Sequence, residues 1–100
     1  MVLVFFYKLI LDSKLIYVGS TTNFNERKRL HQLASKADHK LVYKTIRDQG
    51  GWTKVSMCLV EHAFCVDQEH RRAREQYWLN EYRSSDLCNV RKAYVGGVAV

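Results

Sequence analysis

The sequence predicts a small α+β fold in which a mainly antiparallel, three-stranded sheet is flanked by helices. Two segments rich in β-branched and aromatic residues, 2–10 and 15–19, lie on either side of the turn-like Asp12-Ser13-Lys14 and are expected to form a hairpin. Two helical patterns follow, and a third β-type run at 55–60 precedes a long helical pattern. The expected order is therefore β-β-α-α-β-α, which is typical of the α+β class.

The register of the hairpin decides where two tyrosines point. Residues directly opposite each other in an antiparallel pair share a face, and the sequence numbers of every such pair add up to the same sum. Because side chains alternate along a strand, Tyr7 and Tyr17 share a face only if this sum is even. A three-residue loop at 11–13, or an equivalent bulge, gives an even sum. A plain two-residue turn at Asp12-Ser13 instead pairs Tyr7 with Val18 and separates the two phenols.

The first helix is expected over 24–34. Asn23 is followed three positions later by Glu26, an arrangement similar to a capping box in which the Asn side chain accepts from the first amides of the helix. One face of this helix is expected to carry Phe24, Arg27, Leu30 and His31.

Two further helices are marked by their ends. Gly50-Gly51 is expected to provide a left-handed cap at the end of a helix over 39–49. Asp67 is expected to cap the beginning of a helix over 68–83. The inward face of this last helix is expected to carry Ala73, Tyr77, Trp78 and Tyr82.

Composition limits the class of protein. One hundred residues, 47% of them hydrophobic, suffice for one core but not for two, so a single domain is expected over 1–93, followed by an apolar tail at 94–100 whose order the sequence leaves open. Sixteen Lys and Arg against ten Asp and Glu give a net charge of +6, which favours nucleic acid as the partner. Many small soluble proteins are also basic, so charge alone does not establish this.

Cysteine usage and hydropathy predict a soluble intracellular protein. Cys58, Cys65 and Cys88 are odd in number and lack C-x-x-C spacing, so neither a disulfide framework nor a zinc site is indicated. They are expected to be small buried hydrophobes in a reducing compartment, the cytoplasm or the nucleus. The longest apolar run, 2–7, is far shorter than the ~20 residues that cross a bilayer.

Four residues able to hold phosphate or move protons are expected to converge at one end of the sheet. Arg27 and His31 are four residues apart on one helix face, directly after the hairpin that carries Tyr7 and Tyr17. Each has an ordinary structural explanation when taken singly. Tyr7 and Tyr17 could be half-buried strand aromatics, Arg27 could belong to a solvated basic face, and His31 could be a surface histidine or a core histidine whose hydrogen bonds are satisfied.

In their order along the chain, these residues resemble the GIY-YIG nucleases over about residues 4–91. The second signature of that family matches as Tyr17-Val18-Gly19, its arginine and histidine match Arg27 and His31 in NERKRLH, its helical glutamate resembles Glu75 in AREQYW, and its late asparagine resembles Asn89. The joint occurrence of these motifs outweighs the ordinary explanation of each one.

The first signature departs from the family pattern. Phe5-Phe6-Tyr7 stands where the family has Gly-Ile-Tyr, so the tyrosine is kept while a large aromatic replaces the glycine. Because glycine allows close backbone approach, Phe5 is expected to narrow the edge of the site.

The resemblance implies a metal-dependent DNA endonuclease. Glu75 would hold one Mg²⁺ or Mn²⁺ ion, with water and phosphate oxygens completing its coordination. Arg27 would stabilise charge on the attacked phosphate. Tyr7 is the first choice for general base, with neutral His31 accepting its proton, and Tyr17 would orient the water or the phosphate.

Supporting roles follow from the same resemblance. Gly19 would let the backbone come near the phosphate, and Asn89 would hold the site together through side-chain hydrogen bonds. Glu75 has the alternative of being only an ion-pair partner of Arg71. The basic side chains most suited to contact the DNA backbone are Lys28, Arg29, Arg71, Arg72 and Arg74.

Substrate choice is left open by the sequence. A chain of this length has no room for a separate targeting domain, so sequence specificity is expected to be low or to come from a partner protein. Duplex, flapped and branched DNA all remain candidates. The alternative to an enzyme is a nucleic-acid-binding module that keeps the scaffold without cleavage. The presence of Arg27, Glu75 and both tyrosines favours the enzyme, whereas the replacement at Phe5 favours the module.

Overall fold

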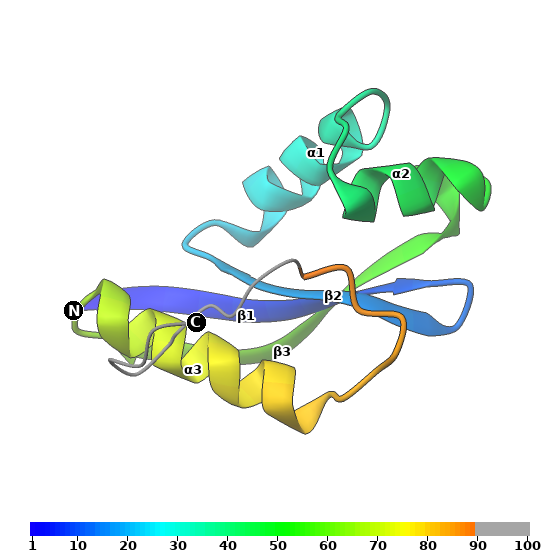
Figure 1. Ribbon diagram of the computed structural model, residues 1–100. Helices are drawn as coiled ribbons and strands as arrows, with labels where there is room; N and C mark the ends of the chain where they lie inside the picture. The colour runs from blue at the N-terminus through cyan, green and yellow to red at the C-terminus, as the bar shows by residue number, and fades with distance from the viewer. Residues whose placement is uncertain (90–100) are drawn as a thin grey trace.

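A three-stranded antiparallel sheet, with β1 (Val2–Leu11) between β2 (Lys14–Thr21) and β3 (Val55–Cys65), forms the centre of the structure (Figure 1). The computed structural model describes residues 1–89. The predicted tail at 94–100 lies outside the described residues. The other elements are α1 (Phe24–Ala34), α2 (Leu41–Asp48), a short 3₁₀ turn η1 (Trp52–Lys54) and α3 (Gln68–Glu81). This order confirms the predicted β-β-α-α-β-α arrangement.

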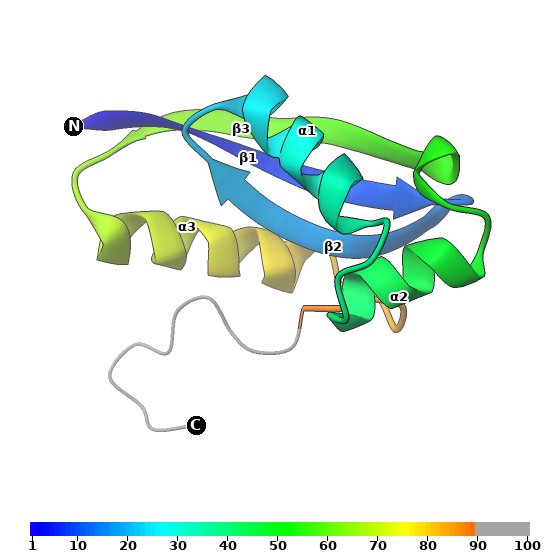
Figure 2. The same cartoon turned by 90° about the horizontal axis from the view of Figure 1, so that it is seen from above.

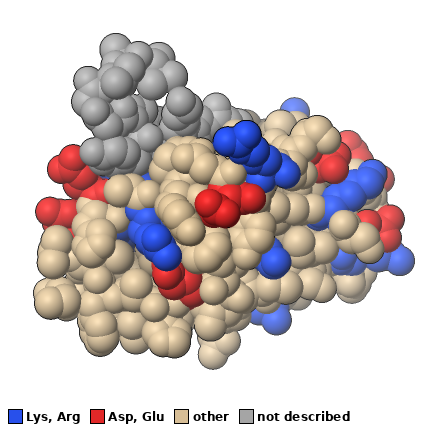
Figure 3. All heavy atoms as spheres, turned by 90° about the horizontal axis from the view of Figure 1, so that it is seen from below, with Lys and Arg blue, Asp and Glu red and all other residues tan. Residues whose placement is uncertain are grey.

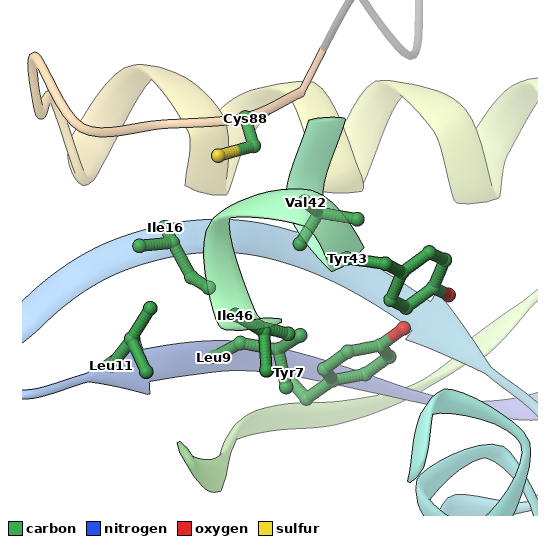
Figure 4. Close-up of a cluster of buried hydrophobic side chains, with 8 residues drawn as sticks. All are labelled: Tyr7, Leu9, Leu11, Ile16, Val42, Tyr43, Ile46 and Cys88. Atoms are coloured by element: carbon green, nitrogen blue, oxygen red, sulfur yellow. The ribbon is translucent and has the colours of Figure 1, made fainter. Parts of the chain in front are cut away.

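The helices cover both faces of the sheet: α1 and α2 lie on one side and α3 on the other (Figures 1 and 2). The central strand is therefore buried on both faces, which explains its nearly continuous apolar sequence VLVFFYKLIL. Val4 and Phe6 pack with Cys65 and Trp78 on the α3 side. The larger cluster, on the side of α2, contains Tyr7, Leu9, Leu11, Ile16, Val42, Tyr43, Ile46 and Cys88 (Figure 4).

The hairpin between β1 and β2 has a two-residue turn. Asp12 and Ser13 both adopt positive φ, 49° and 69°, as a tight turn with the twist of the flanking strands requires. Leu11 accordingly pairs with Lys14. Continued without interruption, this register would pair Tyr7 with Val18 and place the two tyrosines on opposite faces.

A bulge in β2 changes the register before the tyrosines are reached. Leu9 pairs with Tyr17 rather than with Ile16, so Ile16 is the extra residue, and Tyr7 pairs with Gly19. The rings of Tyr7 and Tyr17 consequently lie on the same face, with centroids 6.3 Å apart. The even-sum register is confirmed, and a bulge rather than a longer loop produces it.

Side chains cap two helices at their beginnings, as predicted. Asn23 Oδ1 accepts a hydrogen bond from the Glu26 amide at 3.1 Å, and Asp67 Oδ1 accepts from the His70 amide at 2.8 Å. The Glu26 side chain does not complete a capping box, because it bonds Arg29 instead.

The end of α2 is capped by glycines. Gly50 and Gly51 have φ of 117° and 92°, and the Gly51 amide donates to the Ile46 carbonyl at 2.8 Å. The helix begins at Leu41, two residues later than predicted, because the Asp38 side chain accepts from the Lys40 amide and holds the preceding residues in a turn.

The prediction for the third strand was too short. Strand β3 continues to Cys65, five residues beyond the predicted end. The polar residue Glu61 lies within this additional part of the strand and faces α3. Its carboxylate accepts from the Arg74 guanidinium at 2.6 and 2.7 Å and from Trp78 Nε1 at 3.1 Å. A polar residue with such partners can lie inside a strand without ending it.

Tyr77, which was predicted to face inward, and Leu30, which was predicted to share a face of α1 with His31, are both exposed. Tyr77 is 43% exposed. One side of its ring is covered by the Arg74 guanidinium, 4.2 Å from the ring centroid, instead of by the sheet. Leu30 is 41% exposed, and the buried position of α1 is taken by His31.

The three cysteines are free thiols, of which Cys65 and Cys88 are buried. Within residues 1–89, no helix has the length and apolar character to span a membrane.

Candidate active site

A hydrogen bond between Tyr7 and His31 lies at the centre of the candidate site. Tyr7 comes from β1 and His31 from the last turn of α1, and the Tyr7 hydroxyl lies 2.6 Å from His31 Nε2. Both side chains are almost completely removed from solvent, at 1% and 0% exposure. The sequence predicted that these two residues converge, and the structure brings them into direct contact.

Tyr17 and Gly19 complete the wall of this centre. The ring of Tyr17 lies 5.7 Å from that of His31, centroid to centroid. A Cβ atom on Gly19 would lie 2.6 Å from the Tyr7 hydroxyl oxygen and 2.8 Å from Tyr17 Cε2. Gly19 is therefore needed to leave room for the two phenols. Close approach of phosphate to its backbone, which the family resemblance implied, stays a prediction.

Arg27 lies one turn before His31 on the same face of α1, as the i,i+4 spacing predicted. It is half-buried, and its Nε donates to the Tyr7 hydroxyl at 3.4 Å. Burial raises the pKa of Tyr7 and Tyr17 above the usual phenol value, while the positive charge of Arg27 acts in the opposite direction. Both phenols are therefore protonated at neutral pH.

His31 is neutral at the same pH. Its burial, together with the positive charges of Arg27 and Lys40, lowers its pKa to about 4. Its second ring nitrogen, Nδ1, lies 2.8 Å from the hydroxyl of Tyr43 on α2. Tyr43 falls within the helix predicted over 39–49, and nothing in its spacing shows that its polar end reaches a histidine on another helix.

Glu75 lies on the α3 side of β2. Its Oε1 accepts a hydrogen bond from the Ser20 hydroxyl at 2.7 Å. Arg71, one turn earlier on α3, donates to the Ser20 hydroxyl at 2.8 Å and to the Ser20 carbonyl at 2.9 Å. Ser20 thus joins the two charged groups, and the sequence did not identify it. Burial raises the pKa of Glu75, although Ser20 and the nearby arginines act in the opposite direction.

The Glu75 carboxylate lies on one face of β2 and the phenols of Tyr7 and Tyr17 lie on the other. Strand β2 is an outer strand of the sheet. Neighbouring residues of a strand point to opposite faces, so Gly19 faces the phenols while Ser20 faces α3. Glu75 raises the pKa of Tyr17 and Arg27 lowers it, so this phenol lies within electrostatic reach of both charges. The positive charge of Arg27 and the negative charge of Glu75 therefore both act on Tyr17, at the edge of the sheet that β2 forms.

Asn89 holds this edge from outside the sheet. Its Oδ1 accepts from the Val18 amide at 3.1 Å and its Nδ2 donates to the Val18 carbonyl at 2.9 Å. The preceding amide, of Cys88, donates to the Ile16 carbonyl at 2.6 Å. The asparagine side chain thereby takes the place of a neighbouring strand, and its bonds are of the kind that the resemblance implied.

The basic residues proposed for DNA contact are not equivalent. Arg29 is ion-paired with Glu26, and Arg74 with Glu61. Arg71 is bonded to Ser20, whereas Lys28 and Arg72 are exposed. On the side where α3 lies, blue and red side chains alternate instead of forming one basic patch (Figure 3). The contact of this set with DNA stays a prediction.

Phe5 lies near this site without entering it. It pairs with Thr21 on β2, is half-buried, and lines a shallow pocket together with Phe24 and Leu59. Phe24 in turn contacts the Tyr7 ring edge-on, with centroids 6.3 Å apart. Phe5 therefore borders the site, and the narrowing of its edge stays a prediction. Its effect on activity stays a prediction.

The donor set fits one type of metal ion. Within residues 1–89, no three His, Cys, Asp or Glu side chains lie close enough together to enclose a metal. Mg²⁺ or Mn²⁺ can bind through one carboxylate together with water and substrate phosphate, and Glu75 is such a carboxylate.

Comparison with known proteins places the chain in a family. A family model described as the GIY-YIG catalytic domain matches residues 4–96. No curated protein and no solved structure gives a significant match to the chain.

Proposed function

The chain belongs to the GIY-YIG family of nucleases, and from this premise we propose that it is a metal-dependent DNA endonuclease with low intrinsic sequence specificity. The observation that carries the proposal is the 2.6 Å hydrogen bond between Tyr7 and His31, beside Arg27 and across the edge of β2 from Glu75. Hydrolysis of a phosphodiester needs a proton acceptor for the attacking water and a positive charge for the attacked phosphate. These residues can supply both.

Proton transfer is the task of Tyr7 and His31. Burial raises the pKa of Tyr7, so a standing phenolate is unfavourable. The phenol can nevertheless accept a proton from water while it passes its own proton to His31 Nε2, so that Tyr7 stays neutral throughout. One proton leaves water and one arrives on the imidazole. The lowered pKa of His31 then favours release of that proton.

Charge stabilisation is the task of Arg27. A guanidinium is planar, permanently charged and suited to binding two phosphate oxygens at once. Because Arg27 is half-buried, its attraction to developing charge is screened less than that of a surface lysine. Tyr17, beside both Arg27 and Glu75, is placed to orient the water or the phosphate.

Glu75 is the residue that would hold Mg²⁺ or Mn²⁺. The bound ion would polarise the phosphate and favour ionisation of water. Ser20 fixes one oxygen of the carboxylate, and Arg71 fixes Ser20. This bonding limits the positions that the carboxylate can adopt.

Polyanionic DNA agrees with the net charge of +6. Contacts to phosphate carry little sequence information, so low sequence preference is part of the proposal. A partner protein or a particular DNA structure would then supply selectivity. Duplex, flapped and branched DNA are the substrates to compare.

Cleavage of supercoiled plasmid tests the proposal. The chain is incubated with plasmid in Mg²⁺, in Mn²⁺ and in excess chelator, and the nicked and linear products are measured. Metal-dependent nicking that disappears in Glu75→Gln supports the endonuclease. Salt-sensitive DNA binding without cleavage in either metal would instead identify a binding module on the same scaffold.

A further inference from the structure

His31 has a buried partner on each ring nitrogen. Nε2 lies 2.6 Å from the Tyr7 hydroxyl and Nδ1 lies 2.8 Å from the Tyr43 hydroxyl. Tyr43 is 5% exposed and comes from the first turn of α2, so it approaches the imidazole from a different helix. The proton relay proposed above uses Nε2 and leaves the contact at Nδ1 without a role.

A neutral imidazole carries only one N–H, so its two nitrogens must act differently. One nitrogen donates a hydrogen bond and the other accepts one. If the proton is on Nε2, the imidazole donates to Tyr7 and cannot accept the proton of that phenol. If the proton is on Nδ1, Nε2 has a free lone pair directed at the Tyr7 hydroxyl. Only the second tautomer allows the relay.

The neighbours of Tyr7 favour this second tautomer. The Tyr7 oxygen already accepts a hydrogen bond from Arg27 Nε. An oxygen that accepts from a cation is a stronger donor through its own O–H, because the chain of hydrogen bonds is polarised in one direction. The described contacts give Tyr7 one acceptor, His31 Nε2. Tyr43 can then accept from Nδ1–H.

We infer that Tyr43 is a positioning residue that holds the His31 proton on Nδ1 and so keeps Nε2 ready to receive the proton of Tyr7. This inference rests on the proposed function for its catalytic meaning, whereas the tautomer itself is a property of the free protein. In the relay, the Tyr7 O–H bond breaks as the Nε2–H bond forms, and the Tyr7 oxygen gains a proton from water. Tyr43 stays protonated and accepts from Nδ1–H before and after the transfer.

Tyr43→Phe tests this inference, because it removes one oxygen and keeps the ring in the core. The hydroxyl groups of Tyr7 and Tyr43 lie at the same end of the packed cluster, so this change leaves the apolar contacts of both rings in place (Figure 4). Tyr77→Phe is the matched control, since Tyr77 is 43% exposed on α3. Nitrogen-15 NMR of the imidazole ring identifies which nitrogen carries the proton, and His31→Gln assigns its signals.

We expect Nδ1–H in the wild-type protein and in Tyr77→Phe, and a shift towards Nε2–H in Tyr43→Phe. In the cleavage assay, Tyr43→Phe should lower kcat by roughly 10-fold or more with little change in KM, whereas Tyr77→Phe should leave both unchanged. Wild-type protein with Nε2–H overturns the inference, as does a Tyr43→Phe variant that is folded and keeps Nδ1–H. The NMR result on wild-type protein does not depend on the folding of any variant.

The two proposals fail in different ways. If wild-type protein does not cut DNA but shows Nδ1–H that Tyr43→Phe removes, the endonuclease proposal fails and the tautomer assignment holds. If it cuts DNA while His31 carries its proton on Nε2, the endonuclease proposal holds and the role of Tyr43 is overturned.

Discussion

Tyr7 and His31, 24 residues apart in the chain, share a buried hydrogen bond of 2.6 Å that joins the central strand to the first helix. This bond has a double function in the structure. It satisfies two polar groups that burial would otherwise penalise, and it aligns a proton donor with an acceptor. Packing and proposed chemistry therefore depend on the same two atoms.

Stability should fall in mild acid because of His31. Its folded-state pKa of about 4 lies below the usual value of 6.5, so the unfolded chain binds the proton more readily between these two pH values. Stability is therefore full above about pH 6.5 and is lost as the pH falls towards 4, by at most about 3 kcal/mol. Urea unfolding at a series of pH values measures this. A His31→Gln variant with the same pH dependence as wild type would contradict it.

Gly19→Ala should damage the site more than its small size suggests. The new Cβ would lie 2.6 Å from the Tyr7 hydroxyl oxygen, and the buried Tyr7 ring cannot move away freely. We expect a loss of about 1–3 kcal/mol in unfolding free energy, typical of overpacking, together with a large loss of cleavage. Gly51→Ala is the control: it strains a positive φ with no atom within 4 Å, so it should reduce stability and leave cleavage by the folded protein intact.

Glu75→Gln should separate cleavage from binding. The change keeps the size of the side chain and removes the charge proposed to hold the metal, so cleavage in Mg²⁺ should fall by orders of magnitude. DNA binding without metal should stay the same or tighten slightly, because one negative charge is lost. Glu81→Gln, on the exposed part of the same helix, should behave like wild type. Cleavage by Glu75→Gln at a near wild-type rate would exclude the one-carboxylate metal site.

Arg27→Ala and Lys28→Ala should differ although each removes one positive charge. Arg27 is half-buried and bonded to Tyr7, whereas Lys28 is exposed on the other side of the helix turn. Arg27→Ala should depress kcat severely and weaken DNA binding measurably, because its interaction strengthens as charge develops on phosphate. Lys28→Ala should weaken binding slightly and leave kcat unchanged. Equal kinetic effects of the two changes would remove Arg27 from the proposed mechanism.

Salt should weaken DNA binding in proportion to the number of phosphates contacted. On duplex DNA, the logarithm of the affinity should fall by about 0.9 per neutralised phosphate for each unit in the logarithm of salt concentration. Arg72→Ala should lower this slope if the exposed Arg72 contacts a phosphate. Titrations with two unrelated DNA sequences should give similar affinities. A strong preference for one sequence would reveal base contacts that the proposal lacks.

The sequence predicted the order of the elements well because each has a local signal. Asn23, Asp67 and Gly50-Gly51 mark helix ends through bonds to nearby backbone groups, and such bonds depend on spacing alone. The end of β3 was missed because Glu61 is polar, and its partners Arg74 and Trp78 come from a later helix. Contacts between distant segments are not encoded in local periodicity.

The same distinction applies to the candidate site. The convergence of Tyr7, Arg27 and His31 followed from one hairpin and one helix face, both of which are local features. Tyr43 and Ser20 were missed because their contacts depend on how α2 and α3 pack against the sheet. The close approach of the Tyr7 ring to Gly19 was not predicted either, since the direction in which that ring leans is a property of the packed core.

The extra residue at Ile16 makes the pairing of the hairpin arm critical. The turn at Asp12-Ser13 is exposed, and exposed turns ordinarily tolerate insertions and deletions. Here, a change that shifts the pairing of Tyr17 by one residue would exchange the two faces of the rest of β2, turning Tyr17 towards α3 and Ser20 towards α1. A shift of two residues would restore the original faces. Functional variants of this hairpin arm should therefore keep Tyr17 on the face of β2 that it shares with Tyr7.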